Sequence, residues 1–250
     1  MEAPAGQDHR EDLERMLNFE ALRSIARRGV IHIGAHQGQE IEQYFDFGFE
    51  RIVLIEANPE WHDFLVSEFG HDARIRIFNY AICDEEGVVD FHVHTSRSGS
   101  TEPASILRMK RFSEIVQTLH TPKVLRVPAT TLDSLFDKQG LSGGDYNFLN
   151  MDIQGAELLA LKGADGLLSS LDVIVSEVNV LEMYDGGATE DDIVAFLALR
   201  GFEKRLGRYH NLTENGAEFP AWGECLFMRG NGSRHADEIV GDAVDALKSS

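Results

Sequence analysis

Short apolar runs alternate along the chain with segments whose apolar residues recur at helical spacing. Residues 30–33 and 51–56 are typical of buried strands, and residues 40–47 between them show the spacing of a helix. Asn58 and Pro59 then open a further helix, because asparagine is a favourable N-cap and proline suits the first helical position. Strands that alternate with helices predict an α/β fold with a parallel sheet that helices cover on both faces.

The same pattern gives the remaining elements. The helix after Asn58 carries an apolar face of Trp61, Phe64, Leu65 and Phe69. We expect further strands at 74–80, 88–94, 124–128, 146–152 and 172–178, helices at 106–120, 132–138, 156–163 and 190–200, and a loop at 95–105. In a parallel sheet, ligands bind beyond the carboxyl ends of the strands. The chemistry is therefore expected just after Ile33, Glu56, Asp152 and Val178.

The end of the main domain departs from this alternation. Two late strands, 202–210 and 222–229, flank a turn-rich stretch, which predicts an antiparallel pair at a sheet edge. Trp222 and Phe227 fit the core of the last strand. Three regions result: a helical N-terminal extension at 1–28, the main domain at 29–229, and a C-terminal tail or helix at 230–250.

The charge balance narrows the choice of partners. The 250 residues include 42 acids and 23 bases, a formal net charge of -19, so no strong basic field exists for nucleic acid or an anionic membrane. Cys83 and Cys225 cannot form a disulfide framework and are expected to be buried thiols. No run approaches the roughly 18 apolar residues of a membrane helix, and the polar N-terminus lacks a signal peptide's apolar segment. We expect a soluble, cytoplasmic protein without nucleic-acid or membrane partners. Its oligomeric state, homo-oligomer included, stays open.

The first predicted strand runs directly into Gly34-Ala-His-Gln-Gly38 and then into a helix. Glycines at such a turn let the backbone approach a ligand and expose amide donors. A dinucleotide fingerprint would read Gly-x-Gly-x-x-Gly, but His36 stands at the second glycine position and Gln39 at the third. The pattern counts against a turn that binds a pyrophosphate. The two glycines fit a simple turn between a strand and a helix as well as they fit a ligand-binding loop.

Glu56 ends the second predicted strand, 22 residues after Gly34. An acid about 20 residues beyond the glycine loop is where a nucleotide ribose finds a partner for its hydroxyl groups. The alternative is a solvated or salt-bridged acid at a strand end. Because Glu56 follows an apolar strand in phase with the Gly34 loop, the sequence favours a ribose contact.

Several stretches together resemble a known enzyme family. They are Ile31-His-Ile-Gly-Ala-His-Gln-Gly38, Ile55-Glu-Ala-Asn-Pro59, Asn79-Tyr-Ala-Ile-Cys-Asp84, Val127-Pro-Ala-Thr-Thr-Leu-Asp133, Leu149-Asn-Met-Asp-Ile-Gln-Gly-Ala-Glu157 and Leu161-Lys-Gly-Ala164. Over about residues 29–229 the chain is similar to the S-adenosylmethionine-dependent FkbM-type methyltransferases, and the block from Asp152 to Glu157 is the most specific part. Two positions depart from the family. His32 replaces its usual acid two residues before the first glycine, and His36 replaces a common asparagine.

The resemblance implies a Rossmann-like class I methyltransferase fold, a three-layer sandwich with a mostly parallel sheet and an antiparallel last strand. It implies S-adenosylmethionine as the cofactor and methyl transfer to a hydroxyl of a sugar or small secondary metabolite. Glu56 would hold the ribose hydroxyls. The other positions implied to contact the cofactor are Gly34, Ala35, His36, Gly38, Ala57, Asn58, Ala81, Ile82, Ser105, Asp152 and Gln154.

Methyl transfer to a hydroxyl requires an aligned acceptor and a base for its proton. Asp152 ends a predicted strand at the expected mouth, where it would accept that proton, hold the cofactor's amino group or bind a metal. Its structural alternative is an N-cap for the next helix. Glu177 ends the following strand and His210 lies at the rim, so both are further catalytic candidates. A divalent metal such as Mg²⁺ would take Asp152 and Glu177 as ligands, but no strict metal spacing requires one.

Two other functions fit parts of the pattern. A nicotinamide-dependent oxidoreductase would use a related fold, although the missing glycine fingerprint counts against it. A non-catalytic module that binds the cofactor or a partner would tolerate His32 in place of the acid. Glu56 and Asp152 argue for an enzyme instead.

Overall fold

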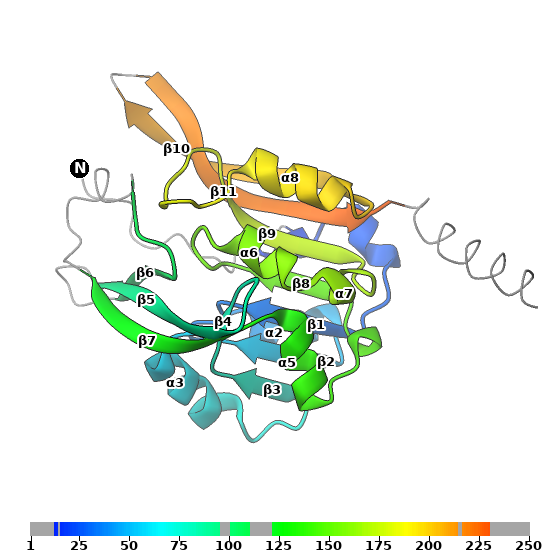
Figure 1. The fold of residues 1–250 in the computed structure, drawn as a ribbon. Helices are drawn as coiled ribbons and strands as arrows, with labels where there is room; N and C mark the ends of the chain where they lie inside the picture. The colour runs from blue at the N-terminus through cyan, green and yellow to red at the C-terminus, as the bar shows by residue number, and fades with distance from the viewer. Residues whose placement is uncertain (1–12, 15, 96–100, 111–121, 215–216, 231–250) are drawn as a thin grey trace, which may run out of the picture.

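The computed structural model describes residues 13–14, 16–95, 101–110, 122–214 and 217–230. Within them the main sheet has seven strands in the order β10-β11-β9-β8-β1-β2-β3 (Figure 1). These strands are β1 (Gly29–Ile33), β2 (Arg51–Ile55), β3 (Ile75–Phe78), β8 (Phe148–Met151), β9 (Val173–Asn179), β10 (Phe202–Glu214) and β11 (Ala217–Arg229). The five strands from β9 to β3 are parallel, and β11 runs antiparallel to both β9 and β10. The expected α/β class, with its antiparallel last strand, is confirmed.

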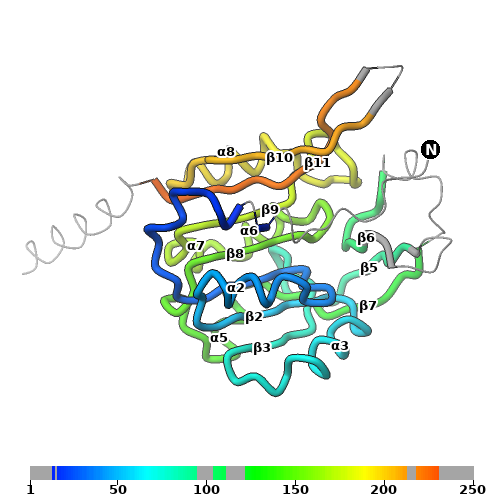
Figure 2. The backbone as a smooth tube through the Cα atoms, turned by 180° about the vertical axis from the view of Figure 1, so that it is seen from behind, coloured from blue at the N-terminus to red at the C-terminus, as the bar shows by residue number. Residues whose placement is uncertain are grey.

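Helices cover both faces of this sheet, as Figures 1 and 2 show from opposite sides. One face packs against α5 (Leu132–Gln139), α6 (Glu157–Lys162), α7 (Asp165–Leu168) and α8 (Glu190–Ala198). The other face packs against α2 (Ile41–Phe47), α3 (Pro59–Phe69) and an N-terminal segment that includes the 3-10 helix η1 (Glu20–Ser24). Leu13, Met16 and Leu22 of that segment are buried in the same core as the strands. The N-terminal segment therefore forms part of one layer.

Several helix ends follow the expected local signals. Asn58 caps α3 by accepting a hydrogen bond from the Glu60 backbone N–H at 3.0 Å, and Pro59 is the first helical residue. The Thr131 hydroxyl accepts from the Ser134 backbone N–H at 3.1 Å and so caps α5. These contacts satisfy amides that a helix start leaves unpaired, which is why the sequence predicts both helix starts correctly.

A second sheet, with strand order β4-β7-β5-β6, stands beside the main one. Its strands are β4 (Ala81–Ile82), β5 (Gly87–Thr95), β6 (Thr101–Ser105) and β7 (Lys123–Thr130). The expected loop at 95–105 is therefore wrong at its end, because β6 pairs antiparallel with β5. The expected helix at 106–120 is wrong over residues 106–110, where Met109 instead forms a β-bridge with Tyr184. The rest of that helix lies outside the described residues.

The late hairpin is longer than the sequence predicts. Residues 202–214 and 217–229 pair along their whole length, and β11 also pairs with β9 from Trp222 to Met228. The antiparallel pairing is as expected, but of these two strands β10 alone lies at the sheet edge, because β11 is inserted between β10 and β9. Phe227 is buried as predicted, whereas Trp222 is only half-buried.

Two further expectations concern the whole chain. Cys83 and Cys225 are buried free thiols, as predicted. No helix among the described residues has both the length and the apolar character needed to cross a membrane. The C-terminal region expected at 230–250 lies outside the described residues except for Gly230.

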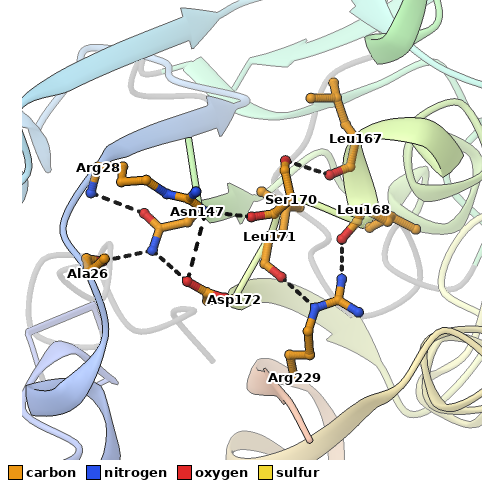
Figure 3. A network of polar contacts seen from close by, with 9 residues as sticks. All are labelled: Ala26, Arg28, Asn147, Leu167, Leu168, Ser170, Leu171, Asp172 and Arg229. Atoms are coloured by element: carbon orange, nitrogen blue, oxygen red, sulfur yellow. Dashed lines mark hydrogen bonds and ion pairs between the residues drawn. The ribbon is translucent and has the colours of Figure 1, made fainter. Parts of the chain in front are cut away.

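A buried polar network ties the amino-terminal ends of the central strands together (Figure 3). The Asn147 side chain is fully buried and donates to the Ala26 carbonyl at 2.7 Å and to the Asp172 carboxylate at 2.8 Å. It also accepts from the Arg28 backbone N–H at 3.2 Å. The Arg229 guanidinium donates to the carbonyls of the loop before β9, including Leu171 at 2.9 Å. The network therefore links the N-terminal segment, β8, β9 and the end of β11.

Replacing Asn147 with alanine is expected to lower the free energy of unfolding by about 3 kcal/mol, because it leaves several buried polar groups without partners. Urea unfolding measures this loss. The matched change at the exposed Asn211 of β10 is expected to cost less than about 0.5 kcal/mol. A loss at Asn147 below about 1 kcal/mol would mean that the network contributes little to stability.

Candidate active site

A cleft of about 440 Å³ opens at the carboxyl ends of the central parallel strands. The predicted residues that line it are Gly34, Ala35, His36, Glu56, Ala57, Asn58, Ala81, Ile82, Asp152, Gln154 and Glu177. Gly38, Ser105 and His210 are not among its lining residues. The structure thus brings together most of the residues that the sequence selects, at the edge of the sheet where ligands of α/β proteins bind.

The loop after β1 passes very close to the end of β8. Gly34 has a φ of 84°, and a Cβ atom there would lie 2.0 Å from the Asp152 carbonyl oxygen. Only glycine permits that approach, and it also suits the left-handed backbone. Gly38, with a φ of 71°, turns the chain into α2, where a Cβ atom would lie 2.6 Å from the Ile41 side chain. Gly38 therefore packs against the helix side of the loop and does not line the cleft.

Glu56 lies at the end of β2 with its carboxylate held by two backbone amides. His36 donates to one oxygen and Asn58 to the other, each at 2.8 Å. The Asn79 side-chain amide donates to the Glu56 carbonyl at 2.7 Å and fixes the backbone. Burial raises the pKa of Glu56 to about 7, although the two amides oppose that rise. Each carboxylate oxygen keeps a lone pair for a further donor, as a vicinal diol would supply.

An aromatic pair flanks this carboxylate. His36 has a φ of 46°, an uncommon value for a residue other than glycine, and its ring lies 4.4 Å from the Trp61 ring. Both side chains line the cleft. The sequence pattern places Trp61 on the apolar face of α3, but only Leu65 of that face is fully buried. The first turn of α3 points toward the cleft instead, which places an aromatic ring beside the site.

Gln154 connects the two carboxylates at the other side of the cleft. Its side-chain nitrogen donates to Asp152 at 2.7 Å and to Glu177 at 2.9 Å, and its oxygen accepts from the Tyr184 hydroxyl at 2.5 Å. Gln154 has a φ of 58°, and the Ser105 hydroxyl donates to its carbonyl at 2.8 Å. The surrounding contacts thus hold a strained residue in place. Ser105 therefore supports this loop from outside the cleft lining.

Two acids near Gln154, Glu157 and Glu177, hold their protons more strongly than usual. Burial raises the pKa of Glu157 to about 7, and the neighbouring Asp152 adds to the rise. Glu157 lies in the first turn of α6, where its Oε1 accepts from the backbone N–H groups of Ile153 and Gly155. Burial, followed by the charges of Asp152, Glu157 and Glu224, raises the pKa of Glu177 well above its usual range. Neighbouring acids therefore favour states in which only some of them are ionised.

The third catalytic candidate lies apart from these acids. The His210 ring packs against the Trp222 ring with centroids 5.4 Å apart, on β10 and β11. His210 does not line the cleft, so the structure does not bring it to Asp152 and Glu177. Among the residues that the structure describes, no group of three His, Cys, Asp or Glu side chains is arranged to hold a metal ion. The arrangement therefore gives no support to a metal at Asp152 and Glu177.

The profile of one protein family, the methyltransferase FkbM domain, matches residues 32–204 of this chain. That stretch holds the Gly34 loop, Glu56 and the Asp152–Glu157 block. The chain belongs to the FkbM methyltransferase family.

Individual relatives are more distant. A 2-O-methyltransferase, NoeI, of Sinorhizobium fredii is 25% identical over 161 residues, which cover 63% of this chain and 65% of that protein. Magnesium protoporphyrin IX methyltransferase of Synechocystis PCC 6803, solved with S-adenosylmethionine, has a TM-score of 0.46 at 10% identity, covering 89% of this chain and 80% of that one. A candidate RNA methyltransferase of Pyrococcus horikoshii has a TM-score of 0.45 at 12% identity, covering 93% and 92%.

Sequence reasoning missed three residues of the site. Trp61 is hidden in an apolar helix pattern, and Tyr184 follows β9 in a loop with no periodic signal. Glu224 lines the cleft because β11 pairs with β9 and sets it directly opposite Glu177. Two acids that face each other on paired strands are a usable signal, but the pairing must first be known.

The free energy of unfolding is expected to fall as the pH rises through about 7. In the folded protein the pKa of Glu56 and of Glu157 is about 7, whereas the usual pKa of a glutamate is 4.5. The stabilisation that their protonation gives is therefore complete below pH 4.5 and is lost above pH 7. Each group accounts for on the order of 3 kcal/mol between those limits. Urea unfolding at a series of pH values measures the slope, which is expected to be flatter in Glu157→Gln.

The exposed Glu85→Gln serves as the charge-matched control and is expected to keep the wild-type slope. This control separates the effect of one buried acid from the general repulsion of a chain with a net charge of -19. Equal slopes in both variants would contradict the assignment of the pH dependence to Glu157.

Proposed function

We propose that this protein is an S-adenosylmethionine-dependent O-methyltransferase whose acceptor is a hydroxyl of a sugar or small secondary metabolite. The observation that carries the proposal is the Glu56 carboxylate, which the amides of His36 and Asn58 hold at the cleft beside the Gly34 loop. A carboxylate in this place suits the two hydroxyls of a ribose. The relative NoeI, a 2-O-methyltransferase by name, supports oxygen as the methylated atom.

The residues around the cleft fit this cofactor. Glu56 would hold the ribose hydroxyls, and Ala57, Asn58, Ala81 and Ile82 would line the adenine, since all of them face the cleft. Trp61 adds an aromatic face that the sequence analysis did not assign to the site. When bound, S-adenosylmethionine supplies an electrophilic methyl group on a sulfonium cation. The acids that line the cleft favour a cation electrostatically, and no Lys or Arg among the described residues lines it.

Asp152 is the proposed base for the acceptor's proton. It follows β8 at the mouth and lines the cleft, and its Oδ1 accepts a hydrogen bond from the Gln154 side chain. Gln154 would keep Asp152 and Glu177 in fixed positions, because one amide nitrogen donates to both. Glu177 would contact the acceptor at the same mouth. No metal ion is needed for these roles.

Calorimetric titration with S-adenosylhomocysteine tests the proposed cofactor. Saturable binding is expected for the wild type, and Glu56→Gln is expected to weaken it at least about tenfold, because a neutral amide accepts ribose hydroxyls less strongly. Glu85→Gln, on the exposed turn before β5, is expected to bind as the wild type does. Tighter binding of NADH, or no binding of S-adenosylhomocysteine, would overturn the proposal.

Replacing Asp152 with asparagine tests the proposed base. Methyl uptake from labelled S-adenosylmethionine, screened over hydroxylated compounds, is expected to fall about 100-fold in turnover, because general-base catalysis contributes about that much. Binding of S-adenosylhomocysteine is expected to change less than about threefold. An equal loss in binding and turnover would instead assign Asp152 to the cofactor's amino group.

A further inference from the structure

Polar and aromatic side chains continue from the cleft along one face of the late strands. Strand pairing sets Glu224 opposite Glu177 and Trp222 opposite Asn179. It also sets His210 opposite Trp222. Alternate residues of a strand share a face. These five residues therefore lie on the same face of the sheet as Val175 of β9 and Leu226 of β11. We call Glu177, Asn179, His210, Trp222 and Glu224 the platform.

The platform begins inside the cleft and ends beyond it. Glu177 and Glu224 line the cleft, whereas Trp222 and His210 lie two residues farther along their strands. The hairpin of β10 and β11 extends past the end of β9, so this face reaches out from the site (Figure 1). A molecule that reaches Asp152 from this side would therefore rest on the platform.

The composition of the platform points to the kind of molecule. The Trp222 and His210 rings lie 5.4 Å apart and tilted by 31°, so together they offer a broad half-buried aromatic surface. Such a surface suits the C–H face of a pyranose ring. Glu177 and Glu224 accept hydrogen bonds, and the Asn179 amide nitrogen is a buried donor without a partner among the described residues. Hydroxyl groups need both kinds of partner, because each donates and accepts.

The charges of the site set a second condition. Strand pairing sets Glu177 and Glu224 directly opposite each other, an arrangement that is unfavourable when both are ionised. The described lining of the cleft has five acids, Glu40, Glu56, Asp152, Glu177 and Glu224, and no Lys or Arg. Arg208 of β10 is paired with Glu224 in the sheet and does not line the cleft. Its positive charge therefore lies next to the Glu224 carboxylate. An anionic acceptor would meet repulsion from those acids of the lining that are ionised.

We propose that the platform is the acceptor site, and that it takes a neutral or amine-bearing pyranose and rejects phosphorylated sugars and uronates. The proposal rests on the methyltransferase function proposed above and adds where the acceptor binds and which charge it carries. The pyranose lies against Trp222 and His210, and its hydroxyls pair with Glu177, Glu224 and Asn179. The hydroxyl to be methylated then points toward Asp152.

Saturation-transfer NMR with methyl β-D-glucopyranoside, methyl β-D-glucosaminide and methyl β-D-glucuronide tests this site, each with and without S-adenosylhomocysteine. The first two are expected to bind, and the uronate about tenfold more weakly. Trp222→Ala is expected to weaken binding of the neutral glycoside about tenfold. Leu199→Ala removes an exposed apolar side chain at the C-cap of α8 and is expected to leave that binding unchanged. Glu224→Gln is expected to strengthen uronate binding, a gain that a misfolded variant would not show.

Calorimetry with S-adenosylhomocysteine on the same variants separates this proposal from the proposed function. Cofactor binding without any glycoside binding, or with glycoside binding unchanged in Trp222→Ala, would overturn the platform and leave the methyltransferase proposal standing. Equal binding of the uronate and the neutral glycoside would overturn the charge condition. Failure of S-adenosylhomocysteine to bind would overturn the proposed function. Glycoside binding measured without S-adenosylhomocysteine would still test whether the platform binds a pyranose.

Discussion

The contact on which the site depends is the approach of the Gly34 backbone to the Asp152 carbonyl. β1 lies between β2 and β8, so the loop after it lies between Glu56 on one side and Asp152 on the other. No side chain fits at position 34, and the loop can therefore settle against the end of β8. That position directs the His36 amide to Glu56. One close backbone contact thus sets the spacing between the proposed ribose partner and the proposed base.

The site concentrates negative charge at a cost in stability. Glu56, Glu157 and Glu177 are buried enough that their pKa values are raised, and no Lys or Arg of the described lining compensates them. A folded protein keeps such a group only where the surrounding structure holds it in place. Here backbone amides hold Glu56 and Glu157, and the Gln154 amide holds Asp152 and Glu177. A sulfonium cation would offset part of that cost when it binds.

The sequence predicts those parts of the protein whose signals are local. Apolar runs give the central strands, Asn58 and Thr131 give helix starts, and the Gly34 loop with Glu56 gives the position of the cleft. Features that depend on pairing between distant segments are not predicted. β6 is polar and short and becomes a strand only through β5, and Glu224 enters the site only because β11 lies next to β9. His210 shows the converse: the sequence places it at the rim as a catalytic candidate, but strand pairing leaves it outside the lining of the cleft.

The position of β11 between β9 and β10 also bears on how the chain is assembled on the ribosome. β10 is synthesised before β11 but has no partner in the sheet until β11 arrives, and until then the outer edge of β9 stays open. The half of the site around Gly34 and Glu56 lies on segments that are synthesised before β11. The half that carries Glu224 and Trp222 is completed only by the last described strand. The face proposed for the acceptor therefore depends on the last described strand, whereas the cleft around Gly34 and Glu56 depends on segments that are made earlier.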